Sequence, residues 1–248
     1  GFLANKDDGT MWGKFDHIMF DKLLDIADQK GDTPFMINFF TTTNHDPFKV
    51  PESYASRIPP FETGKEKYIR AKRTMAYDDI VLSEFFEDAK THDWYDNTIF
   101  IITADHGLNV HRNIPNHPLN GHIPFIIYSP MIDSPRTSNK IVSQIDILPT
   151  LLDIMDEDQY LPQLYGNSAL ASGNGFACRV SHKNLQWITP NHTYYEFMGS
   201  DKHQLFTYPT IWNDTYTELP TSDPRFNILQ TQSQHYIQHA YYQFKRMY

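Results

Sequence analysis

The chain has 248 residues, a formal net charge of −9 with histidine neutral, 40% hydrophobic residues and 15% aromatic residues. This composition is typical of a folded domain with an apolar core and excludes a disordered segment. The acidic balance, without any basic stripe, predicts that nucleic acid is not a partner, because phosphate backbones are bound through clustered Lys and Arg. A phosphorylated substrate held through a metal ion stays compatible with this charge.

Cys178 is the only cysteine, so the chain has neither an intramolecular disulfide nor a cysteine-based zinc site. The sequence contains no apolar run of 18 or more residues and no signal peptide. Because the chain begins at Gly1 in a loop-like segment, we expect it to be a piece of a longer protein. A membrane anchor or targeting signal upstream would be compatible with this reading.

The first elements along the chain are a helix and a strand. Residues 15–29 have helical spacing, with an apolar face formed by Phe15, Ile18, Met19, Leu23 and Ile26. Residues 34–43, PFMINFFTTT, are predicted to form a short strand buried on both faces. Residues 49–65 carry three prolines and a glycine, which predicts a loop.

A long helix is predicted next, from about residue 66 to residue 90. Its apolar stripe consists of Tyr68, Ala71, Met75, Leu82, Phe85 and Ala89. Asp78 interrupts the stripe, and we expect this carboxylate to lie at the helix edge with a local partner. A strand over residues 98–103 and a second buried strand over 124–130 follow, and residues 143–155 are predicted to form a helix that Pro149 kinks or delimits.

This order of elements predicts an α/β fold with a largely parallel sheet flanked by helices. From residue 175 onward the texture changes to short strands separated by polar turns, which predicts a small antiparallel C-terminal annex. Residues 224–248 are predicted to form a terminal helix. We therefore divide the chain into residues 1–170, a part of the main domain, and residues 171–248, an annex of the same domain. A separate binding module is an alternative for the annex, since eight of the fifteen tyrosines fall after residue 170.

Polar residues gather where the predicted strands end. Asn44 and His45 follow the first strand, Asp105 and His106 follow the second, and His122 precedes the third. Ligands of open α/β sheets bind at the C-terminal ends of strands. A carboxylate beside an imidazole suits a divalent metal ion, and several histidines at one sheet edge suit a phosphate- or sulfate-handling metal site.

Each of these residues has a plainer reading when it is considered alone. Asp105 could cap the next element, and a single loop histidine such as His45 or His122 is more often a hydrogen-bonded surface residue. His111 and His117 lie in the same loop as His122, and we expect both to be loop residues before either is a metal or substrate contact. The convergence of three strand ends favours the metal site.

Six segments, in this order, resemble the sulfatase-like branch of the alkaline phosphatase superfamily, with lipoteichoic acid synthases and related phosphoglycerol or phosphoethanolamine transferases as its nearest members. They are WG at residue 12, PFMINFFTTTNHDPF, MAYDDIVLSEFFE, WYDNTIFIITADHG, HIPFIIYSP, and SQIDILPTLLDIM followed by YGNSAL. The resemblance spans residues 12–170. It implies an alkaline phosphatase-like α/β fold and a divalent metal cofactor such as Mn, Zn, Mg or Ca.

The resemblance also implies roles for individual residues. Asp105 and His106 match the family's second-half metal ligands, and His45 matches a histidine that contacts the substrate's phosphate or sulfate. His122 matches a further substrate contact or a ligand of a second metal, and Asn44 lies beside His45 in the substrate-binding loop. The family's Thr, Ser or formylglycine nucleophile is not found in this chain, so we expect it upstream and expect the fragment alone to be inactive.

The function that the resemblance implies is metal-dependent transfer of a phosphoglycerol-like group from a lipid- or glycan-linked phosphodiester through a covalent enzyme intermediate. The full-length protein would be anchored in the membrane upstream and would act outside the cytoplasm. A sulfatase or phosphodiesterase that transfers the group to water is an alternative within enzymes. A non-catalytic relative that binds a lipid or a partner is an alternative of another class.

Overall fold

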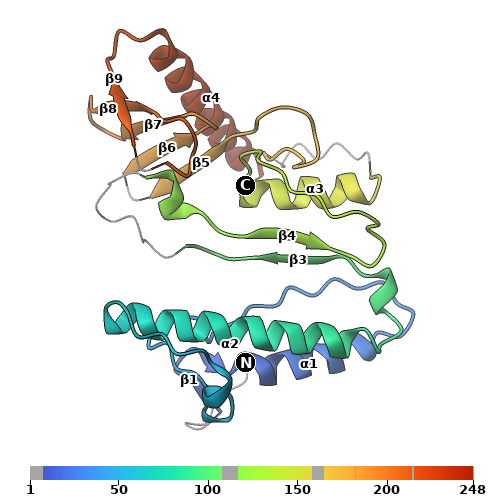
Figure 1. Ribbon diagram of the computed structural model, residues 1–248. Coiled ribbons are helices and arrows are strands. Elements are labelled where there is room, and N and C mark those ends of the chain that lie inside the picture. The colour runs from blue at the N-terminus through green and yellow to red at the C-terminus, as the bar shows by residue number, and fades with distance from the viewer. Residues whose placement is uncertain (1–7, 108–116, 158–164, 182, 214, 248) are drawn as a thin grey trace. The chain divides into compact units, whose positions relative to one another are not determined.

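A computed structural model describes residues 8–107, 117–157, 165–181, 183–213 and 215–247, and the chain folds as two compact units (Figure 1). The first unit comprises residues 1–101 and 127–134, and the second comprises residues 102–126 and 135–248. No helix in the described ranges is long and apolar enough to span a membrane.

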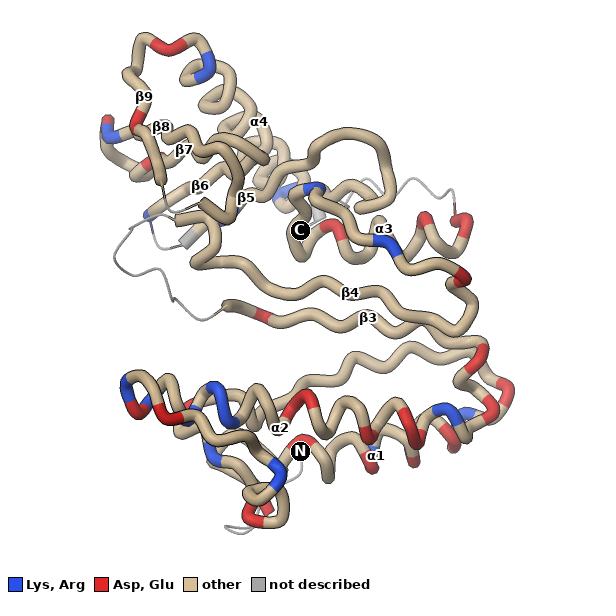
Figure 2. Tube along the Cα trace, viewed as in Figure 1, with Lys and Arg blue, Asp and Glu red and all other residues tan. Residues whose placement is uncertain are grey.

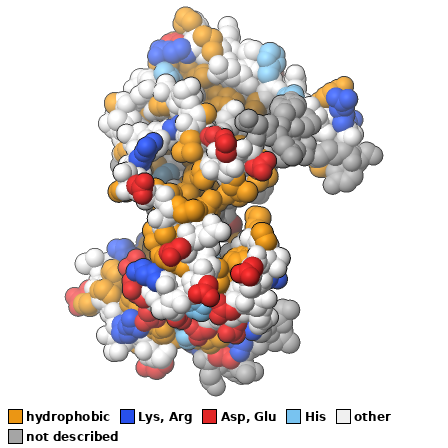
Figure 3. Space-filling model, turned by 90° about the vertical axis from the view of Figure 1, so that its right-hand side faces the viewer, with side chains coloured by type: hydrophobic (Ala, Val, Ile, Leu, Met, Phe, Trp, Pro, Cys, Tyr) orange, Lys and Arg blue, Asp and Glu red, His pale blue; other side chains and the backbone are white. Residues whose placement is uncertain are grey.

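Two long helices dominate the first unit. Its elements are β1 (Gly9–Thr10), β2 (Gly13–Lys14), α1 (Asp16–Asp28), the 3-10 helix η1 (Glu52–Arg57), α2 (Glu66–Ala89) and the 3-10 helix η2 (Tyr95–Asn97). Helices α1 and α2 pack against each other and bury apolar side chains between them and η2, including Leu24, Phe85 and Tyr95. Asp and Glu residues recur along both helices (Figure 2), and acidic side chains gather on this unit on the face drawn in Figure 3.

The helix boundaries are close to those predicted, and the buried faces agree in part, since Ala71, Phe85 and Ala89 of α2 are buried as expected. Other residues of the buried faces were not predicted. Leu24 and Ala27 of α1 are buried, whereas Ile26 is 36% exposed. In α2 the buried residues include Thr74, Tyr77 and Val81, none of which belongs to the predicted stripe. Local spacing finds a helix, but the face that becomes buried depends on the partner helix.

The predicted strand over residues 34–43 is wrong. Residues 35–42 are extended but carry no strand assignment, and Met36 and Phe40 are 82% and 62% exposed. An apolar run shows that a segment suits a buried strand, whereas a strand also requires a neighbouring strand to complete its ladder of hydrogen bonds. No such ladder partner is assigned to this segment in the described part of the chain.

The other two strands predicted before residue 170 are present. β3 (Phe100–Thr103) and β4 (Phe125–Tyr128) pair in a two-stranded sheet. The prediction that residues 124–130 are buried is wrong, because burial alternates along β4 and Ile126 is 51% exposed. This alternation is typical of a strand with only one covered face.

The remaining elements of the second unit are the 3-10 helices η3 (Pro118–Gly121) and η4 (Gln144–Asp146), α3 (Ile147–Ile154), the strands β5 (Ala177–Ser181), β6 (Asn184–Ile188), β7 (His192–Phe197), β8 (His203–Thr207) and β9 (Thr217–Leu219), and the helix α4 (Pro224–Met247). The strands form one antiparallel sheet in the order β5-β6-β7-β8-β9, which confirms the predicted annex. Helix α4 packs on this sheet and contributes Phe226 and Leu229 to a core around Trp187, Tyr194 and Leu205.

Candidate active site

The predicted site residues are divided between the two units. Asn44 and His45 belong to the first unit, and Asp105, His106 and His122 belong to the second. His111 lies outside the described residues. We describe the arrangement within each unit separately.

In the first unit, the loop after residue 43 is held from both sides. The buried carboxylate of Asp16 accepts hydrogen bonds from the backbone N–H groups of Thr42 at 2.8 Å and Thr43 at 3.1 Å. The hydroxyl of Thr74, on α2, donates to Oδ1 of Asn44 at 2.8 Å. These contacts fix the backbone immediately before His45 and engage the side-chain oxygen of Asn44.

His45 itself is half-buried beneath an exposed tryptophan. The ring centroids of His45 and Trp12 lie 4.1 Å apart, and the indole N–H of Trp12 donates to the carbonyl of Asp46 at 2.7 Å. Nδ1 of His45 lies 3.2 Å from the same carbonyl. Because Nδ1–H can donate to this carbonyl, Nε2 is left for an external group.

In the second unit, Asp105 and His106 lie on the loop that follows β3, and both side chains are exposed. The side-chain exposures are 53% for Asp105 and 67% for His106, and Oδ2 of Asp105 lies 3.6 Å from Nε2 of His106. The loop is held by Gln144 of η4, whose Nε2 donates to the carbonyls of Ala104 and Asp105 at 2.9 Å each. Oδ1 of Asp105 accepts from the backbone N–H of His106 at 2.8 Å, and Nδ1 of His106 lies 3.3 Å from the carbonyl of Gly107. The backbone is therefore fixed, and Oδ2 of Asp105 and Nε2 of His106 are the atoms left for an external ligand.

The loop that carries His122 lies directly against the Asp105–His106 loop. A Cβ on Gly107 would lie 2.6 Å from the carbonyl oxygen of His122, so only glycine allows the two backbones to approach this closely. His122 is exposed, and its ring packs edge-on against Trp212 with 5.1 Å between centroids. The two loops are therefore adjacent through their backbones, and the convergence of the Asp105, His106 and His122 side chains on one metal site stays a prediction.

His117 has a different position from the other loop histidines. It is fully buried, its Nδ1 accepts from the backbone N–H of Leu119 at 3.1 Å, and its Nε2 lies 3.2 Å from the hydroxyl of Tyr216. With both ring nitrogens engaged inside the protein, His117 links η3 to the annex.

The donors fit a divalent cation in part. An exposed carboxylate and an exposed imidazole from consecutive residues are suitable ligands for zinc, manganese or related ions. In the described part of the chain, no cluster of three or more His, Cys, Asp or Glu side chains could complete a metal shell. Asp105 and His106 thus fit two positions of a shell that needs further donors.

Sequence reasoning missed three residues near this site: Gln144, Arg179 and Trp212. Gln144 holds the Asp105 loop, Trp212 covers His122, and a Cβ on Gly121, the neighbour of His122, would lie 2.7 Å from Nη1 of Arg179. Arg179 alone left a signal, as a cation within the apolar segment FACRV. Gln144 lies in the segment SQIDILPTLLDIM, which was recognised as family-like without a role for this side chain, and Trp212 lies in a loop with no recognisable pattern.

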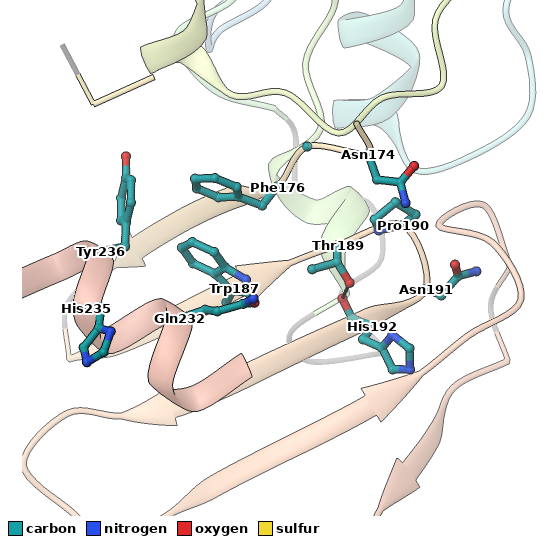
Figure 4. A pocket seen from close by; sticks show the side chains of 11 residues that line it. Asn174, Phe176, Trp187, Thr189, Pro190, Asn191, His192, Gln232, His235 and Tyr236 are labelled. Carbon is teal, nitrogen blue, oxygen red and sulfur yellow. Dashed lines mark hydrogen bonds between the residues drawn. The ribbon is translucent and has the colours of Figure 1, made fainter. Parts of the chain in front are cut away.

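A pocket in the annex is a separate feature of the second unit. It has a volume of about 720 Å³ and lies between the sheet and α4, with Phe176, Trp187 and Tyr236 on one side and Asn191 and His192 on the other (Figure 4). None of the predicted site residues lines this pocket. Its size therefore does not make it the site of the predicted chemistry.

The fold is that of the alkaline phosphatase superfamily. A solved structure of a protein in this superfamily from Vibrio parahaemolyticus superposes with a TM-score of 0.77 over 97% of this chain and 58% of that one, at 25% identity. A putative sulfatase, yidJ from Bacteroides fragilis, superposes with a TM-score of 0.70 over 92% of this chain and 59% of that one, at 18% identity, and supports the fold alone.

The family model described as Sulfatase matches residues 2–157, and this chain belongs to the sulfatase family. Among curated proteins, the chain is 28% identical over 177 residues to the lipoteichoic acid synthase-like YvgJ of Bacillus subtilis, which covers 65% of this chain and 28% of that protein. It is 28% identical over 178 residues to the lipoteichoic acid synthase of Staphylococcus aureus, covering 65% and 26%. The resemblance to this branch is confirmed, and the chain spans about a quarter of the length of these relatives.

Proposed function

We propose that this chain is the C-terminal part of a metal-dependent enzyme that transfers a phosphoglycerol-like group from a lipid- or glycan-linked phosphodiester. Its residues 1–170 would belong to the catalytic domain and residues 171–248 to an annex of it. The observation that carries the proposal is the Asp105–His106 loop, which has an anchored backbone, an exposed carboxylate and an exposed imidazole, and lies against the backbone of His122. Membership of the sulfatase family and similarity to lipoteichoic acid synthases support this chemistry.

In this mechanism Asp105 and His106 hold a divalent ion at the end of β3. The ion would lower the pKa of the attacking hydroxyl and neutralise charge on the transferred group. His45 and His122 donate hydrogen bonds to the non-bridging oxygens or protonate the leaving group, and Asn44 orients the substrate beside His45. The nucleophile that forms the covalent intermediate lies upstream of this chain, as does the membrane anchor that places the site outside the cytoplasm.

A sulfatase or phosphodiesterase activity is the second candidate, since the matching family model is described as Sulfatase. The two candidates share Asp105 and His106 and differ in the upstream nucleophile and the acceptor. A cysteine converted to formylglycine would indicate sulfate esters, whereas threonine or serine would indicate phosphoryl transfer. Release of free glycerol phosphate in place of an acceptor that carries the phosphoglycerol group would indicate transfer to water.

Substitution of Asp105 by Ala in the complete protein tests the proposal. We expect loss of stoichiometric divalent metal, measured by elemental analysis, and a fall in phosphodiester turnover of at least about 100-fold, because a charged ligand is removed. Asp96→Ala is the matched control, since Asp96 is an exposed carboxylate in the turn before the same strand. Metal content and turnover that survive in Asp105→Ala would contradict the assignment.

A further inference from the structure

Arg179 is fixed by a relay of polar side chains that crosses three strands of the annex. It lies on β5 opposite Gln186 of β6, and its Nη2 donates to Oε1 of Gln186 at 2.6 Å. Gln186 is 1% exposed, and its Nε2 donates to the hydroxyl of Thr193 on β7 at 3.0 Å. The plane of the guanidinium is thus set by buried groups, and the side chain is not a mobile surface cation.

This guanidinium has no carboxylate partner among the residues that the structure describes. Burial lowers the pKa of Arg179, and the one opposing influence is the distant phenol of Tyr195. Removing a cation from water without a counterion is costly, and the cost is offset when an anion binds. Nε and Nη1 donate no hydrogen bond within the described residues, so both are available to such an anion.

The free side of Arg179 lies at the loop that carries His122. A Cβ on Gly121 would lie 2.7 Å from Nη1 and 3.3 Å from Cδ, so the arginine packs directly on this glycine. Gly121 precedes His122, whose carbonyl is in close contact with Gly107 of the Asp105–His106 loop. Arg179 of the annex thus contacts the residue next to His122, and the backbone of His122 contacts the Asp105–His106 loop.

We propose that Arg179 binds the tetrahedral oxyanion of the substrate, a phosphate or sulfate group, beside the site formed by Asp105, His106 and His122. The planar fork of a guanidinium matches two oxygens of such a group, and the relay through Gln186 pre-orients it. The placement of this anion site beside a catalytic centre rests on the proposed function. It assigns to the annex a part in binding the reacting group, and it makes Arg179 a determinant of affinity.

The test measures binding of inorganic phosphate and of sulfate to the complete, metal-loaded protein by calorimetry, together with kcat and KM for a phosphodiester. We expect Arg179→Gln to weaken binding of the preferred anion about 10- to 100-fold, since hydrogen bonds to charged groups contribute at this level. The ratio kcat/KM should fall by a similar factor, and the ratio of phosphate to sulfate affinity identifies the source of the oxyanion. Arg179→Lys, which keeps the charge and loses the fork, should give a smaller loss and serves if Arg179→Gln does not fold.

Arg225→Gln is the matched control, because Arg225 is an annex arginine already paired with Asp223 at 2.7 Å. This variant should bind both anions as the parent does. Unchanged anion affinity in folded Arg179→Gln, or no anion binding by the parent protein, would overturn the inference. Loss of anion binding in Arg179→Gln without ester turnover by the parent would support the anion site and reject the proposed function. Turnover that needs Asp105 but not Arg179 would support the proposed function and overturn the inference about Arg179.

Discussion

At the scale of single residues, the carboxyl groups of Asp16 and Asp78 form a pair between α1 and α2. Burial, the charge of Asp16 and a hydrogen bond to Asp16 together raise the pKa of Asp78 to about 8. The partner of Asp78 is therefore on another helix and is itself acidic, so the expected local partner was wrong. A protonated Asp78 supports Asp16, whose carboxylate fixes the backbone of Thr42 and Thr43 before His45.

This pair makes the stability of the first unit depend on pH. The folded chain keeps the Asp78 proton up to about pH 8, whereas the unfolded chain loses it near pH 4. The folded state thus binds more protons in this window, and the free energy of unfolding falls as the pH rises from about 4 to 8. Protonated Asp78 contributes its full stabilisation below the pKa that it has in the unfolded chain. This stabilisation is lost as the pH rises through the folded-state pKa of about 8.

Asp78→Asn is expected to remove this dependence, because an amide can donate to Asp16 without titrating. At pH 8 the variant should be more stable by about 1–2 kcal/mol, or roughly 2–8 °C in Tm for a chain of this size. At pH 4.5 the difference should be close to zero. Thermal unfolding of both proteins between pH 4.5 and pH 8.5 checks this, and a gap that does not grow with pH would contradict the raised pKa.

At the scale of elements, η4 and α3 are organised by the buried carboxylate of Asp146. Its Oδ2 accepts from the backbone N–H of Ser143 at 2.8 Å in a capping box, and its Oδ1 accepts from the backbone N–H of Asn167 at 2.7 Å. One side chain thereby caps the helix and anchors the segment YGNSAL against it. The same 3-10 turn presents Gln144 to the Asp105 loop, so the cap also supports the candidate site.

Asp146→Ala should destabilise the second unit by about 2–4 kcal/mol, because it removes the cap and leaves two part-buried N–H groups without their acceptors. Glu157→Ala is the matched control, since Glu157 is an exposed carboxylate shortly after α3. That variant should change the free energy of unfolding by less than about 1 kcal/mol. Urea unfolding of the three proteins measures both values, and equal losses in the two variants would refute the role of Asp146.

At the scale of the whole molecule, each unit has its own apolar core. The core of the second unit centres on Leu205 and Trp187, and the cores of the first unit include Leu24 and Val81. Cores that do not share side chains can open independently, as cooperative units of differing stability do in other proteins. We therefore expect the two units, divided at residues 101 and 126, to open separately.

Leu205→Ala should expose this independence. The side chain is fully buried, so its truncation should cost about 2–5 kcal/mol in the second unit. Hydrogen exchange should then accelerate in β5–β8 and α4 while amides of α1 and α2 keep their protection. Leu24→Ala should give the opposite pattern, and acceleration throughout the chain in either variant would show that the units unfold together.

Much of the architecture was readable from the sequence. Helical periodicity located α1, α2 and α4, and polar turns between short strands located the annex, because these patterns arise from local geometry. The order of motifs identified the superfamily, and the strand-end rule selected Asp105, His106 and His122, which lie on two loops with adjacent backbones in the second unit. Their roles in metal and substrate binding stay predictions.

Only the tertiary structure decided which surfaces and groups become partners. The partner helix selected the buried faces of α1 and α2, and the lack of a neighbouring strand left residues 35–42 without a ladder. The pairing of Asp16 with Asp78 and the position of Arg179 against Gly121 join residues 62 and 58 positions apart. Such contacts depend on how distant segments pack, and a local pattern cannot encode them, because periodicity reports only on neighbours within a few turns of the chain.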